Sequence, residues 1–167
     1  MTTTWWTLLP SPVDELLLTS DGEALTRVFF SPHKGIETAE RLGQQWHRDD
    51  AHPVLVAAAR QLGEYFAGER RVFDVPLAPT GTQFQLRVWM ALRGIPYGET
   101  RSYGAIAAEL GLGPQASRAV GLANGANPIS IVVPCHRVIG ADGALTGFGG
   151  GLPRKRFLLD LESDLLF

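Results

Sequence analysis

The chemistry in this sequence centres on one residue. Cys135 is the only cysteine among the 167 residues, and His136 follows it directly within the segment Pro134–Val138. The thiolate is the nucleophilic form, and a free cysteine with a pKa of about 8.5 is only a few per cent ionised at neutral pH. A base beside the thiol changes this, so the pair predicts a nucleophile. The alternative is a small buried hydrophobic residue, the commoner role of a lone cysteine.

A histidine base needs a third group that orients its ring. The ring of His136 does not easily reach the side chain directly before it, so a water molecule is expected to bridge the two. Glu162 and Asp160 are both candidates for the orienting carboxylate, and spacing alone does not choose between them. In Cys–His proteases the histidine normally lies far from the cysteine in sequence. The adjacent His136 departs from that pattern, but a Cys–His hydrolase stays the second interpretation of this pair.

A metal site at the cysteine is not expected. Zinc sites use three or four protein ligands, and the chain has no second cysteine. His33, His47 and His52 lie in the acidic half in loop-like surroundings and are interpreted as surface residues. The glycine-rich segment 146–151 has neither a GxGxxG pattern nor a P-loop lysine, so no nucleotide cradle is expected. We predict neither metal nor cofactor.

Composition indicates a folded protein without membrane segments. The chain is 45% hydrophobic and 19% charged, which is typical of globular domains. It has no apolar run approaching the 18 to 20 or so residues that span a bilayer. The first residues lack the basic start and apolar stretch of a signal peptide. Together with the single cysteine, this predicts a cytoplasmic protein.

Charge is unevenly distributed along the chain. Residues 1–82 carry 7 basic and 11 acidic side chains, a net charge of −4, whereas residues 83–167 carry 8 and 6, a net charge of +2. A phosphate-binding surface needs only local positive charge. The half that carries the cysteine is thus the half compatible with a nucleic-acid partner.

The first half has the pattern of a small α/β domain. Apolar segments 16–19 and 24–30 flank an Asp-Gly pair, which predicts a β-hairpin. Pro53 opens a helical run with apolar residues at three- and four-residue steps, and Gly68 ends it. Segment 76–81 resembles a linker. We predict a supporting domain over residues 1–79 and a second, mainly helical domain over residues 80–167.

The second half predicts short helices around a tight turn. Thr82 is positioned to cap a helix with Val88 and Leu92 on one face. Helices over 102–110 and 114–124, separated by Gly111-Leu112-Gly113, fit a helix-turn-helix. An ordinary helical hairpin in a core fits the same spacing equally well. A closing helix is expected over 152–161, with Leu158 and Leu161 facing inward.

The second of these two helices is unusual in composition. Segment 115–125 has one charged residue, Arg118, among many small ones. A helix that reads bases in the major groove carries several Arg, Asn, Gln or Lys residues, whereas small residues permit the close approach that the minor groove requires. The next apolar run, 129–133, predicts a buried extended segment that delivers Pro134 and Cys135 at its end.

These residues resemble a known family. Pro134-Cys135-His136-Arg137-Val138, preceded by Asn127-Pro128 and the Arg118 helix, resembles the O6-alkylguanine-DNA alkyltransferases. The segments 84–89 and 95–103 are similar to the same family, and the match runs in order over residues 80–162. The resemblance implies a ribonuclease H-like N-terminal domain and a winged-helix-like helix-turn-helix in the C-terminal domain.

The resemblance implies a single-turnover methyltransferase that repairs DNA. Cys135 would take the alkyl group from O6-alkylguanine, and O4-alkylthymine is a further expected substrate. His136 would form the thiolate through the bridging water, Glu162 would orient His136, and Asn127 would hold the connecting turn. The expected partner is double-stranded DNA containing alkylated guanine, bound through the minor groove with the nucleotide flipped out, by a monomeric protein.

The resemblance also assigns contact residues. Tyr103 would help to rotate the nucleotide outward and Arg118 would fill the space that it leaves. The set expected to contact DNA is Arg118, Tyr103, Ser102, Ala116, Ser117 and Ala119. The set expected around the base is Tyr103, Pro134, Val138, Phe148 and Gly149, with the carbonyls of residues 135 and 138 facing the exocyclic amine of guanine and the backbone of residues 148 and 149 donating to O6.

Two departures from the family pattern stand out. Some members bind a structural zinc through N-terminal cysteines, which this chain lacks. Some have Tyr and Ser where this chain has Phe148 and Gly149, which bears on pocket width. A related binding module that marks lesions without chemistry lacks the nucleophile, so Cys135 argues against that alternative.

Overall fold

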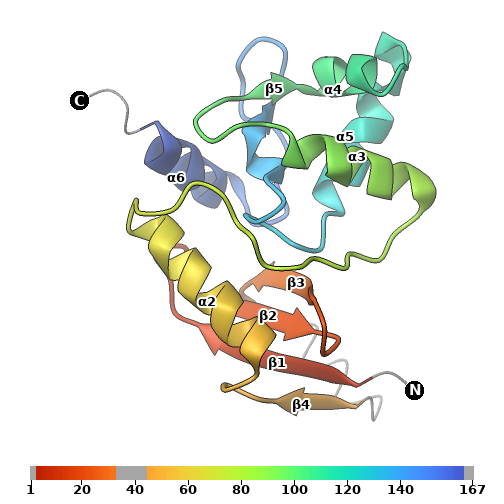
Figure 1. Cartoon of the computed structure of the whole chain (residues 1–167). Helices are drawn as coiled ribbons and strands as arrows, with labels where there is room; N and C mark the ends of the chain where they lie inside the picture. Colours follow the sequence, from red (N-terminus) through yellow and green to blue (C-terminus); the bar gives the residue numbers. More distant parts are fainter. Residues whose placement is uncertain (1–2, 33–44, 164–167) are drawn as a thin grey trace. The chain divides into compact units, whose positions relative to one another are not determined.

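The computed structural model describes residues 3–32 and 45–163, and the chain divides into two compact units, residues 1–79 and 80–167. The first unit is a mixed sheet with a helix packed on it (Figure 1). In sheet order its strands are β3 (Leu25–Phe30), β2 (Leu16–Ser20), β1 (Thr4–Leu9) and β4 (Trp46–Arg48). β1, β2 and β3 are antiparallel, while β4 runs parallel to β1. The predicted hairpin is confirmed as β2–β3, whereas β1 and β4 were not predicted.

Helix α2 (Pro53–Phe66) covers the sheet and follows the predicted pattern. Its buried apolar residues are Leu55, Ala58, Leu62 and Tyr65. His52 caps its start, because the imidazole accepts a hydrogen bond from the Val54 amide at 3.3 Å. The helix ends before Gly68, whose φ of 77° suits a residue without a β-carbon.

The histidines of the first unit differ from one another. His47 is exposed, as expected. His52 is half-buried, with its ring 5.3 Å from that of Trp5, and is therefore a capping residue rather than a free surface side chain. His33 lies outside the described residues.

The second unit is mainly helical, as predicted (Figure 1). Its elements in chain order are α3 (Gln83–Arg93), β5 (Arg101–Ser102), α4 (Tyr103–Glu109), the 3-10 turn η1 (Pro114–Ala116), α5 (Ser117–Gly125), the 3-10 turn η2 (Cys135–Arg137), β6 (Val138–Ile139) and α6 (Leu152–Glu162). Thr82 and Gln85 form a reciprocal capping box at the start of α3. The Trp89 indole donates to the Ala123 carbonyl at 2.8 Å and so ties α3 to α5.

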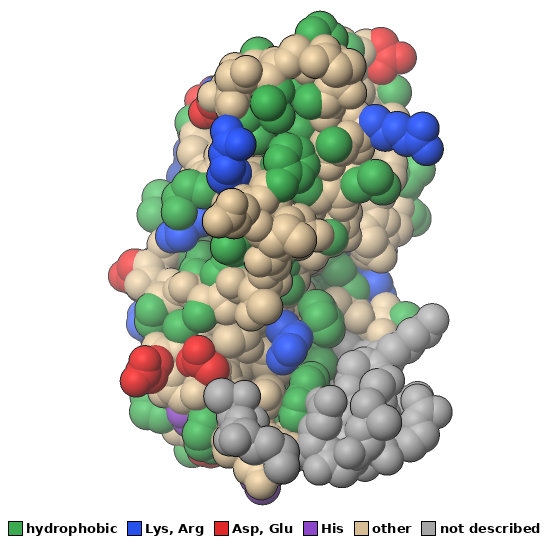
Figure 2. All heavy atoms as spheres, turned by 90° about the vertical axis from the view of Figure 1, so that its right-hand side faces the viewer, with side chains coloured by type: hydrophobic (Ala, Val, Ile, Leu, Met, Phe, Trp, Pro, Cys, Tyr) green, Lys and Arg blue, Asp and Glu red, His purple; other side chains and the backbone are tan. Residues whose placement is uncertain are grey.

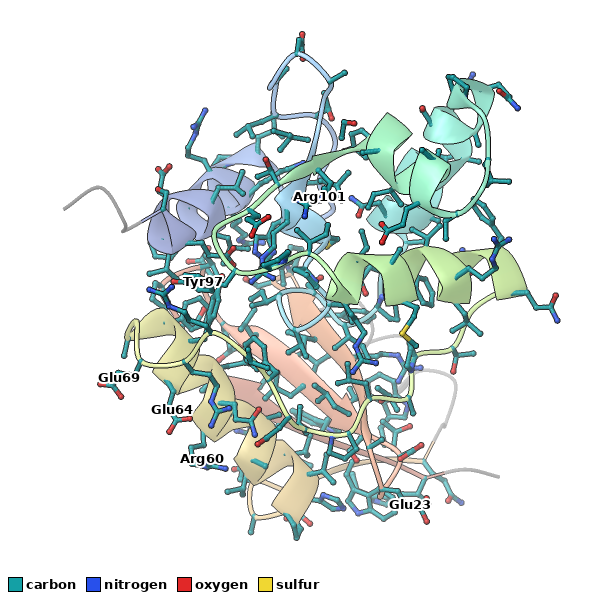
Figure 3. The ribbon with its side chains drawn as sticks, turned by 45° about the horizontal axis from the view of Figure 1, so that its top comes forward. Glu23, Arg60, Glu64, Glu69, Tyr97 and Arg101 are labelled. Carbon is teal, nitrogen blue, oxygen red and sulfur yellow. The ribbon has the colours of Figure 1, made fainter. Side chains whose placement is uncertain are left out.

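A two-stranded parallel sheet joins the start of helix α4 to the cysteine segment. β5 pairs with β6, with Arg101 opposite Val138 and Ser102 opposite Ile139; Arg101 is labelled in Figure 3. The Ser102 hydroxyl then caps α4 by accepting from the Ala105 amide at 3.0 Å. This pairing holds the start of α4 beside the end of the Cys135 turn.

The prediction of an extended segment over residues 129–133 was wrong in conformation. The run is buried, but it folds as tight turns, with the Val133 amide donating to the Ile129 carbonyl at 3.0 Å and Ile131 at a φ of 73°. Asn127 makes this possible. Its side chain donates to the Val133 carbonyl at 2.9 Å and accepts from the Ile129 amide at 3.0 Å. A side chain thus satisfies backbone groups that a strand neighbour would otherwise have bonded.

One helix boundary and one expected core position differ from expectation. The helix predicted from residue 114 begins as a 3-10 turn and becomes α-helical only at Ser117. In α6, Leu158 is buried as predicted, but Leu161 is only half-buried. The inward positions are taken instead by two charged residues, Lys155 and Glu162.

In the described parts of the chain, no helix has the length and apolar character needed to cross a membrane.

Candidate active site

Cys135 begins the 3-10 turn η2 and is enclosed, with 4% of its surface exposed. Its amide donates to the Val133 carbonyl at 2.8 Å, and its own carbonyl accepts from the Asn124 side-chain amide at 3.2 Å. Asn127 holds the same turn through Val133. Two asparagines from the end of α5 and the turn after it therefore position the backbone that carries the thiol.

Opposing effects act on the ionisation of this thiol. Burial raises the pKa of Cys135, because a thiolate loses its hydration inside the protein. A hydrogen bond from Asn127, the positive charge of Lys155 and the backbone amides of residues 135 and 136 act to lower the pKa. Burial is the largest of these effects, so the thiol needs a proton acceptor before it can attack.

His136 is fully buried beside this thiol and is held by Glu162. The His136 Nε2 and the Glu162 Oε2 lie 2.6 Å apart. Glu162 also accepts from Arg137, at 2.7 Å from Nε to Oε1 and at 3.0 Å from the terminal guanidinium nitrogen to Oε2. The structure thus brings Glu162 to the histidine, whereas Asp160 is exposed on the same helix.

The charge state of Glu162 determines the tautomer of the ring. Burial raises its pKa, but hydrogen bonds and charge from His136 and Arg137 outweigh burial and bring the pKa to about 2. An ionised carboxylate only accepts, so Nε2 carries the ring proton and Nδ1 presents a lone pair. Burial lowers the pKa of His136 and so favours the neutral ring, while the hydrogen bond and charge of Glu162 oppose this effect. Nδ1 has no hydrogen-bond partner within the described residues and is available as a proton acceptor.

Arg137 is itself fixed on several sides. Its guanidinium donates to the Ile95 carbonyl at 2.6 Å and lies 5.7 Å from the centre of the Tyr97 ring, which is labelled in Figure 3. The Tyr97 hydroxyl donates to the Leu161 carbonyl at 3.3 Å, near the end of α6. These contacts make the carboxylate of Glu162 a fixed point in the site.

Lys155 is a buried charged residue of the site that was not predicted from the sequence. It is fully buried, and its ammonium donates to the Val138 carbonyl at 2.6 Å and to the Thr146 carbonyl at 2.9 Å. Burial lowers the pKa of Lys155, and the nearby Cys135 opposes this effect. The spacing 155, 158 and 162 marks one helical face. That periodicity was a signal that Lys155 faces inward. The inward face was instead predicted from the apolar residues Leu158 and Leu161.

Residues expected to surround the base lie around the same turn. Pro134 and Val138 are buried, Phe148 is half-buried and Gly149 is exposed. A β-carbon on Gly149 would lie 3.7 Å from the Gly125 carbonyl, so the glycine-rich loop approaches the end of α5. The carbonyls of Cys135 and Val138 each already accept one hydrogen bond, and a carbonyl oxygen has a second lone pair for another donor.

Three of the six residues expected to contact DNA, Tyr103, Ser117 and Arg118, line a hollow of ≈ 400 Å³. It is lined by Tyr103, Ser117, Arg118, Gly121, Leu122 and Gly147. Tyr103 packs over Gly121, where a β-carbon would lie 3.7 Å from the ring, and its hydroxyl accepts from Thr146 at 3.1 Å. Arg118 and Ala119 are exposed, Ala116 and Ser117 are half-buried, and half-buried Ser102 caps α4.

Asn124 also went unnoticed in the sequence. It is 2% exposed, and its Oδ1 has no hydrogen-bond partner within the described residues. Together with Val120, Ala123 and Asn127 it follows an i, i+3, i+4, i+7 pattern of buried positions. A polar residue in that inward stripe was the available signal.

Among the residues that the structure describes, no group of histidine, cysteine and acidic side chains could hold a metal ion.

An enclosed thiol next to a His–Glu pair, in a helical unit with an exposed arginine-bearing helix, indicates a protein that uses a cysteine nucleophile. The chain belongs to the 6-O-methylguanine DNA methyltransferase family. The model of that family's DNA binding domain matches residues 83–164, and the model of its ribonuclease-like domain matches residues 4–79.

Individual relatives agree over nearly the whole chain. A methylated-DNA–protein-cysteine methyltransferase of Methanosarcina acetivorans is 52% identical, over 96% of this chain and 99% of that protein. The protein of the same name from Mycobacterium bovis is 53% identical over 93% and 90%. The crystal structure of Mycobacterium tuberculosis OGT in complex with DNA has a TM-score of 0.84 at 50% identity, covering 95% of this chain and 92% of that one.

Proposed function

We propose that this protein repairs DNA by transferring the alkyl group of O6-alkylguanine to the sulfur of Cys135, once per molecule. The observation that carries this proposal is the enclosed Cys135 followed directly by His136, whose Nε2 lies 2.6 Å from an ionised Glu162 and whose Nδ1 has no partner within the described residues. Membership of the family defines the reaction class. O4-alkylthymine is a second proposed substrate.

The reaction proceeds by displacement at the alkyl carbon. The Cys135 proton passes to Nδ1 of His136, through a bridging water, and the sulfur then forms a bond to the alkyl carbon. The bond between that carbon and guanine O6 breaks, its electrons remain on guanine, and the proton taken from the thiol neutralises the base. A thioether is a poor leaving group, so Cys135 is consumed.

The DNA duplex binds to the helix-turn-helix through its minor groove. The target atom is inaccessible in a base stack, so the nucleotide must turn outward. Tyr103 assists this rotation and Arg118 fills the vacated space. Small residues around them permit close approach to the backbone: Ser102, Ala116, Ser117 and Ala119. Few base-reading side chains are present, which suits repair in any sequence context.

The flipped base is held by the turn around Cys135 and by the glycine-rich loop. Pro134 and Val138 form one wall, and the backbone at Phe148 and Gly149 donates to O6. Asn127 keeps the turn in shape through its bonds to the Ile129 amide and the Val133 carbonyl. The carbonyls of Cys135 and Val138 accept hydrogen bonds from the exocyclic amine of guanine, and the site recognises the base in this way.

The finer architecture is part of the same proposal. Residues 1–79 form a ribonuclease H-like supporting domain, and residues 80–167 form the reactive domain with a winged-helix-like motif. A reaction that consumes a reduced thiol suits the cytoplasm, where thiols stay reduced. We place the protein there, acting as a monomer.

Intact-mass measurement tests this function. The protein is incubated with duplex DNA that contains O6-methylguanine, and it is expected to gain the mass of one methyl group, located on Cys135 by peptide mapping. Cys135→Ser serves as the control and gains none. A folded protein that remains unmodified would refute the proposal. Repeated release of product from ester or peptide substrates would instead support the Cys–His hydrolase.

A further inference from the structure

The outward face of α5 carries two long side chains among small ones. The exposed positions of the helix and its C-cap are Arg118, Ala119, Leu122, Gly125 and Ala126, which we call the outer face of α5. Leu122 is 71% exposed. It follows Arg118 by four residues, so the two side chains lie one turn, or about 6 Å, apart along the helix.

Leu122 is not an isolated apolar residue on a surface. It lines the same ≈ 400 Å³ hollow as Tyr103 and Arg118, the two residues assigned to nucleotide rotation. Figure 2 shows hydrophobic side chains gathered between Lys and Arg side chains on the part of the surface where the helices of the second unit lie. Arg118 is exposed, and within the described residues its side chain makes no hydrogen bond or ion pair, so both long residues of this face are available to a ligand.

We propose that Leu122 enters the DNA minor groove together with Arg118 and packs against its sugar-lined walls. This inference rests on the proposed function. Proteins that bind the minor groove often place an apolar side chain such as Leu in it, beside basic residues. The groove is only about 6 Å wide, and the neighbouring Ala119, Gly121 and Gly125 leave room for one branched side chain to reach its floor.

The two residues contribute different kinds of binding energy. Arg118 brings a positive charge into the DNA and releases counterions from it. Its contribution to the binding free energy therefore weakens as the salt concentration rises. Leu122 removes apolar surface from water, and that contribution does not depend on counterion release. Salt dependence therefore separates a groove contact by Leu122 from an indirect effect on Arg118.

Duplex binding against salt concentration tests the proposal. The Cys135→Ser protein binds duplex DNA bearing O6-methylguanine without reacting, and Leu122→Ala is added to it. We expect about tenfold weaker affinity, from the apolar surface lost, with an unchanged slope of log affinity against log salt. Arg118→Ala is expected to reduce that slope by about one. Leu122→Met retains apolar volume and is expected to bind within about twofold of the parent.

Leu86→Ala is the matched control, since Leu86 is also an exposed helical leucine, at 39%, but lies on α3 away from the hollow. We expect its affinity to equal that of the parent. Equal affinities for the Leu122→Ala and Leu86→Ala proteins would overturn the proposal. With Cys135 intact, a Leu122→Ala protein that loses reaction with free O6-alkylguanine as severely as with duplex would also overturn it. If the protein with Cys135 intact takes no methyl group from DNA, the proposed function itself fails, which is a separate result.

Discussion

The reaction centre and the outer face of α5 are built in opposite ways. The reaction centre, defined as Cys135, His136, Lys155 and Glu162, is buried, and its charged groups bond to side chains and backbone at 2.6 to 3.0 Å. The outer face of α5 is exposed and consists mostly of Ala and Gly. In the reaction centre most polar groups are hydrogen-bonded within the protein, whereas the two long side chains of the outer face of α5 are exposed to a ligand.

This difference follows from what each region must do. A displacement reaction requires the nucleophile and its base to be held in a fixed geometry. A surface that meets damaged DNA of any sequence requires close approach and charge, but few base-reading groups. Substitutions in the reaction centre should therefore change the chemical step, whereas substitutions on the outer face of α5 should change duplex binding.

Glu162→Gln gives the largest expected effect. Loss of the carboxylate removes the charge that orients His136 and stabilises its protonated form, so the single-turnover rate of methyl transfer should fall about 10²- to 10³-fold. Quench-flow with duplex substrate measures this rate. Asp160→Asn makes the equivalent change at an exposed position on the same helix and should leave the rate within about twofold. Similar losses in both proteins would contradict the role of Glu162.

Acid should destabilise the protein through the same group. The folded pKa of Glu162 is about 2, below its usual 4.5, so its stabilisation is present above pH 4.5 and is lost as pH falls towards 2. The lowered pKa of buried His136 acts in the same direction, beginning below pH 6.5. Urea unfolding should show about 3 kcal/mol lost to Glu162 over its window. A Glu162→Gln protein with the same pH dependence as the parent would exclude this assignment.

Lys155→Met should affect chemistry through the thiol. Removing its positive charge leaves the burial of Cys135 less opposed, so the pKa of the thiol should rise further and the pH–rate profile should move to higher pH. At neutral pH we therefore expect a slower single-turnover rate of methyl transfer. Arg156→Met removes an exposed charge from the adjacent position and should leave the profile in place. A slower rate without movement of the profile would indicate a purely structural role.

Arg118→Ala is expected to leave the chemical step nearly unchanged and to affect only the reaction with duplex. That reaction should slow by about tenfold if, as proposed, Arg118 replaces the flipped nucleotide. Reaction with a free O6-alkylguanine base should change less than twofold. The ratio of the two rates is the measurement, with exposed Arg93→Ala on α3 as the control. Equal losses on both substrates would remove the distinction between the two regions.

Local signals in the sequence predicted much of this protein. Thr82 and Pro53 marked helix starts because capping depends on near neighbours, and the Asp-Gly pair marked the β2–β3 turn for the same reason. The strands β1 and β4 escaped prediction since their pairing joins segments distant in the chain. Residues 129–133 had β-branched composition, but a side chain, Asn127, replaced the strand partner that this composition implied.

The sequence by itself predicted a nucleophile with a neighbouring base and showed the small-residue helix with one arginine, because these features are contiguous and set by residue type. Spacing alone left Glu162 and Asp160 open, and the family resemblance favoured Glu162. The tertiary structure supplies the physical reason, since two carboxylates two residues apart point to different sides of a helix, one buried and one exposed. It alone revealed Lys155 against the Val138 and Thr146 carbonyls. A buried charge is stabilised by partners remote in the chain, and those partners exist only once the chain has folded.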